Sequence, residues 1–143
     1  MKGLVIALAL AVIGTNAKAQ TIDSSVVTST LGVSPEHLSV RTSSQGVVDV
    51  KYQVAGCSVS ASAARTGFKN DLVRLLPAML AKYPWIRNIK VAGGCPVLDV
   101  YGRGDYDDSF ISAMFMRDEL DKVVWDKVRP EDLFSRVSFG RFE

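Results

Sequence analysis

Residues 47–54 read VVDVKYQV, and residues 66–84 read TGFKNDLVRLLPAMLAKYP. The first segment alternates apolar with polar residues, which is the period of a strand with one buried face. In the second, apolar residues recur at steps of three and four and form one helical face: Phe68, Leu72, Leu75, Leu76, Met79 and Tyr83. We expect a kink at Pro77, because proline removes a backbone hydrogen bond. The two segments predict a helix packed on one face of a sheet.

More strands are predicted after this helix. The first covers residues 86–91, and a turn at Gly93–Pro96 separates it from a second at residues 97–101. Residues 102–107 have the composition of a hairpin connection. The apolar run at residues 109–116 fits a buried strand or the start of a helix, and the preceding hairpin favours a strand.

Short helices complete the pattern. One is predicted at residues 118–125, and a turn or helix at residues 129–137. Residues 58–65 are small and polar, which favours a loop or a second short strand. The order strand, helix, strand, strand, strand, helix predicts an α+β fold, with a mainly antiparallel sheet and a helix packed on one face.

The first 19 residues have the three parts of a secretory signal peptide in the required order. Lys2 supplies the positive charge, residues 3–14 the apolar run, and Ala17 and Ala19 the small residues before a cut at Gln20. The apolar run is shorter than the roughly 20 residues of a membrane-spanning helix. We therefore expect a periplasmic or secreted protein without a stable membrane anchor, and an uncleaved anchor is the alternative.

Cleavage changes the charge of the chain. The chain has 17 basic and 15 acidic residues, and two of the basic ones, Lys2 and Lys18, leave with the signal peptide. The remaining chain is formally neutral. Nucleic-acid binding requires a dense basic surface, and anionic membranes attract polybasic segments, so neither is an expected partner.

The rest of the chain is long enough for one domain. Residues 20–45 are rich in serine and threonine and form either a loose N-terminal arm or an edge strand. Within them, Ser34 and Pro35 indicate a helix start or turn. Residues 46–143 form a single α+β domain.

The chain has two cysteines, Cys57 and Cys95. A single pair of cysteines in an exported protein is most simply a disulfide. Closing this loop would stabilise the fold by about 4 kcal/mol in the chain-entropy account. Half of a zinc site is the alternative, but the sequence offers no further ligands at suitable spacing.

No catalytic constellation, metal site or cofactor site is predicted. The single histidine, His37, lies in a turn, and no nucleophile-elbow motif occurs. The acidic cluster at residues 105–108 lacks the glycine and glutamate that a calcium-binding EF-hand loop requires. The chain is therefore expected not to be an enzyme.

A partner-binding surface is predicted at the hairpin tip and at the exposed edge of the sheet. Loops on a rigid sheet commonly carry recognition residues. The candidate residues at the tip are Arg103, Asp105, Tyr106 and Asp107.

Residues 82–128 resemble a family. The pattern comprises Lys82-Tyr83-Pro84, Ile89-Lys90-Val91, Asp99-Val100-Tyr101-Gly102, an apolar strand ending at Arg117, and Trp125. It is similar to small exported proteins of conjugative plasmids, the KikA-like transfer-region proteins. The resemblance implies an accessory envelope protein without catalysis, with an envelope or transfer-apparatus protein as partner. The alternative function is a secreted inhibitor or toxin-like effector that inserts the loop Gly93–Pro96 into an enzyme.

Overall fold

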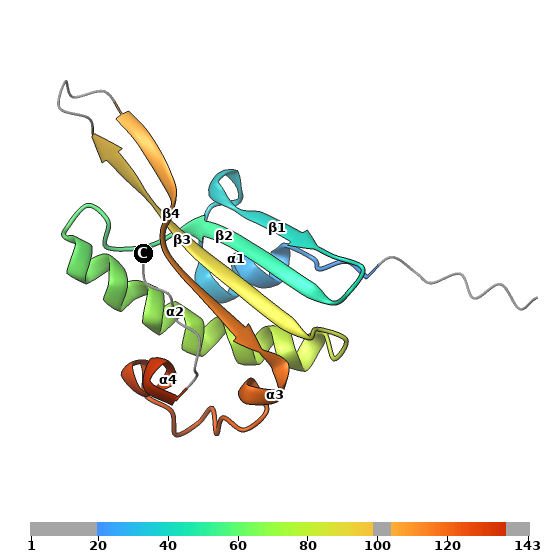
Figure 1. The fold of residues 1–143 in the computed structure, drawn as a ribbon. Coiled ribbons are helices and arrows are strands. Elements are labelled where there is room, and N and C mark those ends of the chain that lie inside the picture. Colours follow the sequence, from blue (N-terminus) through green and yellow to red (C-terminus); the bar gives the residue numbers. More distant parts are fainter. Residues whose placement is uncertain (1–19, 99–103, 137–143) are drawn as a thin grey trace, which may run out of the picture.

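The computed structural model describes residues 20–98 and 104–136. A four-stranded sheet packs against helices in the element order of Figure 1. The elements are α1 (Ser25–Leu31), the 3-10 helix η1 (Pro35–His37), β1 (Ser39–Thr42), β2 (Val47–Gln53), α2 (Ala61–Lys82), β3 (Asn88–Leu98), β4 (Gly104–Met116), α3 (Arg117–Leu120) and α4 (Pro130–Arg136). The predicted α+β class, with a helix on one face of the sheet, is confirmed.

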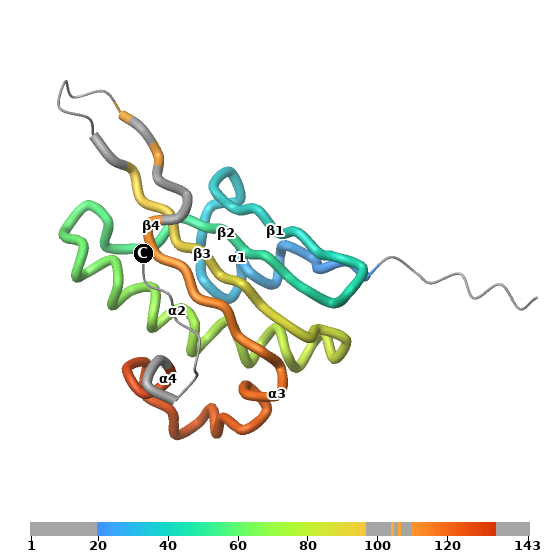
Figure 2. Tube along the Cα trace, viewed as in Figure 1, coloured from blue at the N-terminus to red at the C-terminus, as the bar shows by residue number. Residues whose placement is uncertain are grey.

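The strands lie in the order β1-β2-β3-β4. The outer pairs, β1 with β2 and β3 with β4, are antiparallel, whereas β2 and β3 are parallel. The parallel pair follows from α2, because a helix that crosses the sheet returns the chain in the same strand direction. The sheet is therefore mixed, and the path of the chain through it can be followed in Figure 2.

In β2, the alternation of apolar and polar residues in the sequence matches an alternation of buried and half-buried side chains. Val48, Val50 and Tyr52 point into the core, and the residues between them lie on the other face. The five predicted core positions within α2 are buried, and so is the sixth, Tyr83, which caps the C-terminal end of the helix. The inner face of the sheet adds the side chains of Ile89, Val91, Cys95, Ile111, Ala113 and Phe115.

Helix α2 begins earlier than predicted and continues through Pro77. The expected loop or short strand at residues 58–65 is wrong for residues 61–65, which are helical. Ser60 caps the helix, since its side-chain oxygen accepts a hydrogen bond from the backbone N–H of Ala63 at 3.0 Å. The alanines that follow are the best helix formers, although they gave no apolar periodicity.

The predicted turn at Gly93–Pro96 is wrong, because β3 runs unbroken through these residues. A Cβ atom on Gly93 would lie 2.2 Å from Cγ2 of Val54 and 2.9 Å from Cδ2 of Phe68. On Gly94 it would lie 2.4 Å from the hydroxyl of Tyr106. These glycines therefore permit close packing on both faces of the sheet, and the irregularity is a β-bulge between Gly93 and Cys95.

The predicted strand at residues 109–116 is confirmed as part of β4. The hairpin connection predicted at residues 102–107 is wrong for residues 104–107, which already belong to β4. Val97 and Leu98 extend β3, so they do not form a separate strand. Residues 99–103 lie outside the described residues.

The N-terminal stretch contains the edge strand β1, which pairs with β2, and the helix α1, which contacts α2. Val27 of α1 is fully buried. Pro35 starts the 3-10 helix η1, as predicted. The predicted signal peptide, residues 1–19, lies outside the described residues.

The C-terminal elements are short. The helix expected at residues 118–125 is wrong beyond Leu120, where turns replace it. Of the turn or helix predicted from Arg129, the structure has the helix, α4. Leu120 and Leu133 attach this region to the core. Among the helices of the described ranges, none has the length and apolar character needed to cross a membrane.

Candidate binding surface

The disulfide predicted between Cys57 and Cys95 is present, with its Cα atoms 5.5 Å apart. It joins the loop between β2 and α2 to β3. Cys95 is buried and Cys57 is half-buried. Because both thiols of the chain are used in this bond, neither is a nucleophile or a metal ligand.

The predicted tip residues are not gathered on a loop. Arg103 lies outside the described residues, and the backbones of Asp105, Tyr106 and Asp107 pair with β3. The ring of Tyr106 stacks on His37, with centroids 5.4 Å apart and planes at 17°. Tyr106 is therefore a packing residue between η1 and the base of the β3–β4 hairpin.

A buried polar cluster links β2 to α2. The hydroxyl of Tyr52 donates a hydrogen bond to Oδ2 of Asp71 at 2.9 Å, and Arg74 donates to Oδ1 of the same carboxylate. Burial, together with the Asp71 carboxylate, raises the pKa of Tyr52 far above its usual value. The phenol remains a donor and the carboxylate is paired, so this cluster is structural. Sequence reasoning missed it, although Asp71 interrupts an apolar helix face.

The described residues contain no reactive constellation. In residues 20–98 and 104–136, no group of three or more His, Cys, Asp or Glu side chains is placed to hold a metal ion. His37 is exposed on η1, where its ring stacks on that of Tyr106.

The face of the sheet opposite α2 is uncovered by the described helices. In Figure 1 both α1 and α2 lie behind the sheet, and the near side carries no helix. We call this surface the open face. It comprises the half-buried or exposed side chains of Ser39, Arg41, Asp49, Lys51, Gln53, Lys90, Ser112, Met114 and Met116.

One row of the open face crosses all four strands. Arg41 of β1 lies opposite Asp49 of β2, which lies beside Lys90 of β3, and Lys90 lies opposite Met114 of β4. Lys51 stands in the next row. Within the first row, two cations flank one carboxylate, so this row has a net positive charge.

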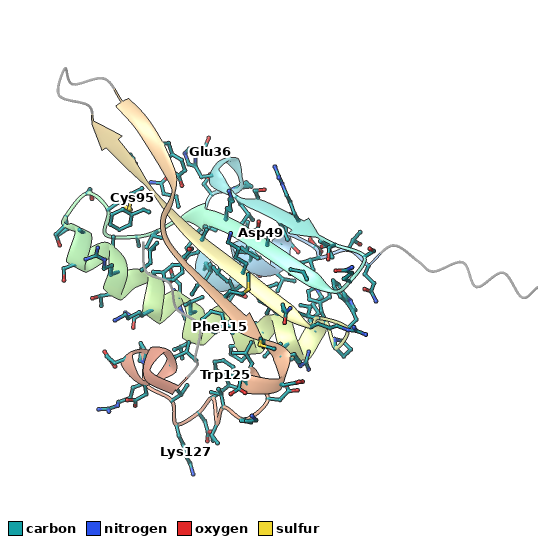
Figure 3. The ribbon with its side chains drawn as sticks, viewed as in Figure 1. Glu36, Asp49, Cys95, Phe115, Trp125 and Lys127 are labelled. Carbon is teal, nitrogen blue, oxygen red and sulfur yellow. A yellow bond between two sulfur atoms is a disulfide. The ribbon has the colours of Figure 1, made fainter. Side chains whose placement is uncertain are left out.

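Asp49, labelled in Figure 3, is the acidic member of this row. Its Oδ1 is buried and has no hydrogen-bond partner, the only such side-chain atom in the described part of the chain. No ion pair joins it to Arg41 or Lys90 within the described ranges. A buried acceptor without a donor costs roughly 1–3 kcal/mol.

The β4 end of the open face is apolar. Met114 is 46% exposed and Met116 is 43% exposed. Methionine is flexible and polarizable, and it adapts to partners of varied shape. The open face therefore joins a basic row to a deformable apolar edge.

A hollow of about 900 Å³ lies at one end of the sheet and is lined by Trp85, Arg87 and Arg117 among others. The guanidinium of Arg117 is already used there. It donates to the backbone oxygens of Tyr83 and Pro84 and pairs with Asp121 at 2.8 Å. Arg117 thus fixes the loop before β3 rather than presenting a free charge.

The polar row of β2 was visible in the sequence, since Asp49, Lys51 and Gln53 alternate with buried residues. The neighbours that complete the open face come from strands far away along the chain. The sequence does not give the order or register of the strands, so Arg41 and Lys90 could not be assigned to the same surface as Asp49.

No protein-family model matches the chain, and neither the curated proteins nor the solved structures gave a significant match.

Proposed function

We propose that the chain is a non-catalytic accessory protein of the cell envelope that binds a partner protein through its open face. The observation that supports this function is the uncovered face of the sheet, with its basic row and exposed methionines. The disulfide favours an oxidising compartment, such as the periplasm or the extracellular medium. A partner in the envelope or a transfer apparatus is consistent with the resemblance of residues 82–128 to KikA-like proteins.

Non-catalysis is supported by the chemistry of the polar side chains. The buried tyrosine and carboxylate, Tyr52 and Asp71, satisfy each other. Both cysteines are bonded, and the histidine stacks on a tyrosine. Nucleophilic catalysis requires a nucleophile within hydrogen-bond reach of a base, and these groups do not supply one.

Site-specific photo-crosslinking in intact cells tests the proposal. A photoreactive amino acid is placed at Lys90 or Met114 on the open face, and at Asn70, which is exposed on α2, as the control. We expect both open-face positions to capture the same envelope or transfer-apparatus protein, and Asn70 to capture none of it. Equal capture from Asn70, or no capture from the open face, would contradict the proposal.

The second candidate function is a secreted inhibitor or effector. The loop that could serve it is the one before α2, and not the predicted loop at residues 93–96. Residues 93–96 are part of β3, so they do not form an inhibitory loop. The loop before α2 is instead fastened by Cys57, and Val59 within it is 78% exposed. The N–H groups of Val59 and Ser60 both donate to the carbonyl of Gly56. A rigid loop with an exposed apolar residue is preorganised for insertion into a cleft.

Growth and lysis assays with the purified protein distinguish this second function. The inhibitor hypothesis requires an effect on a target cell or enzyme that Val59→Asp removes. An effect that Val59→Asp leaves unchanged, or the lack of any effect, counts against it.

A further inference from the structure

We infer that the open face recognises an acidic segment of its partner protein, with carboxylates meeting Arg41 and Lys90 and apolar side chains resting on Met114 and Met116. This inference rests on the proposed function and specifies the chemistry of the partner.

The first argument is charge placement. Arg41 and Lys90 stand on the strands that flank Asp49, at the same level of the sheet. Adjacent strands are about 4.8 Å apart, so the backbones of the two cations are separated by about 10 Å. Carboxylates spaced along one segment could reach both cations, and electrostatic complementarity favours their association.

The second argument is the carboxylate of Asp49, which lies between Arg41 and Lys90 in the row. A purely anionic ligand would be repelled by its charge. A peptide carries N–H groups between its carboxylates. One of these groups can lie beside Asp49 while the acidic side chains meet the flanking cations.

The third argument is the apolar edge. Lys90 and Asn88 pair with Met114 and Met116, so both methionines project beside the basic row. A partner that covers the row would also bury these side chains. Burial of apolar area contributes roughly 25 cal/mol per Å², and mixed acidic and apolar composition therefore suits this surface better than acidity alone.

Nucleic acid and anionic membranes fit the same face less well. Both present dense negative charge, whereas the central side chain of the row is a carboxylate. Each basic residue contributes about 1 kcal/mol near an anionic membrane, and the charge of Asp49 offsets one of the two cations in the row. The observations therefore favour a protein segment.

A binding experiment with defined probes tests the inference. The chain from Gln20 onward is titrated into a short fluorescent peptide in which glutamate alternates with leucine and threonine. The comparison probes are the same peptide with glutamine for glutamate, a single-stranded oligonucleotide, and vesicles containing phosphatidylglycerol. Fluorescence anisotropy and vesicle sedimentation give the affinities, and amide shifts give the location of binding.

We expect saturable binding of the glutamate peptide alone, weakened by salt, with amide shifts on the open-face residues. The double variant Arg41→Gln, Lys90→Gln should weaken this binding by about tenfold or more. The control Arg65→Gln, Lys127→Gln removes the same charge from exposed positions on α2 and near α4, and should change the affinity less than twofold.

Several results would overturn the inference. These are equal affinity for the glutamine peptide, equal weakening by the control variant, or preferential binding of the oligonucleotide or vesicles. If the double variant fails to fold, the salt dependence and the glutamine peptide still test the inference, because both measurements use the unaltered chain.

A neutral blocking variant separates this inference from the proposed function. Ser112→Trp adds bulk to the open face without changing charge. If it abolishes capture of the cellular partner while Arg41→Gln, Lys90→Gln retains full capture, the open face is the docking site but its partner is not acidic. If neither variant reduces capture, the proposed function is wrong as well.

Discussion

At the residue scale, Gly93 shows how tightly β3 packs. A methyl group there would overlap Val54 and would approach Phe68 and Ile111 within about 3 Å, as the 2.9 and 3.0 Å distances indicate. We expect Gly93→Ala to lower the free energy of unfolding by about 1–3 kcal/mol, the usual cost of overpacking a core. Urea denaturation measures this cost. Gly104→Ala is the control, because nothing lies within 4 Å of the added atom, and a similar loss in both variants would contradict the packing account.

Tyr52 makes stability depend on pH at the alkaline end. Its pKa is raised in the folded state, first by burial and then by Asp71, from an ordinary value of 10.0. Above pH 10 the unfolded state therefore loses a proton that the folded state retains, and this tyrosine lowers stability by about 1.4 kcal/mol per pH unit. Tyr52→Phe should remove that component of the slope. At neutral pH, it should cost about 1–3 kcal/mol, because Asp71 loses a donor.

Denaturant titrations of both proteins from neutral pH to beyond pH 10 provide the measurement. The difference between their slopes above pH 10 should approach one proton. Parallel curves across the whole range would mean that Tyr52 ionises normally in the folded state.

At the scale of elements, sequence reasoning succeeded where burial is periodic and failed where another part of the chain decides. The core face of α2 and the alternation of β2 were both predicted, since local spacing records which side is buried. Residues 93–96 were misread as a turn. Glycine is needed at Gly93 and Gly94 because the side chains of Val54, Phe68 and Tyr106, from other parts of the chain, pack closely against them. The early start of α2 was missed because alanines carry no amphipathic pattern.

The start of α2 depends on its cap. Ser60→Ala removes the acceptor that satisfies the N–H of Ala63. We expect a loss of about 1 kcal/mol in the free energy of unfolding, the usual cost of removing such a cap. Thermal or urea denaturation measures it. Ser58→Ala, an exposed change in the same loop, should be nearly neutral, and an equal loss there would argue against capping.

At the scale of the whole molecule, the sequence predicted export, one α+β domain, the disulfide and a partner-binding role. The sequence favoured the hairpin tip as the binding surface, whereas the structure favours the open face. Composition drew attention to the glycines and aspartates near residue 105, but three of the four candidate residues belong to a paired strand. The open face depends on the parallel pairing of β2 with β3. Local periodicity contains no information about strand order, so that surface required the structure.

The disulfide distinguishes the two functions because it lies at one end of the molecule. Replacing both cysteines, Cys57→Ala with Cys95→Ala, should lower the free energy of unfolding by about 4 kcal/mol, measured in urea. Arg41 and Lys90 are held by strand pairing, so the open face should retain its crosslinks at temperatures where this variant is still folded. The loop bearing Val59 should lose its rigid presentation. Loss of partner capture in the folded variant would therefore favour the disulfide-anchored loop over the open face as the functional surface.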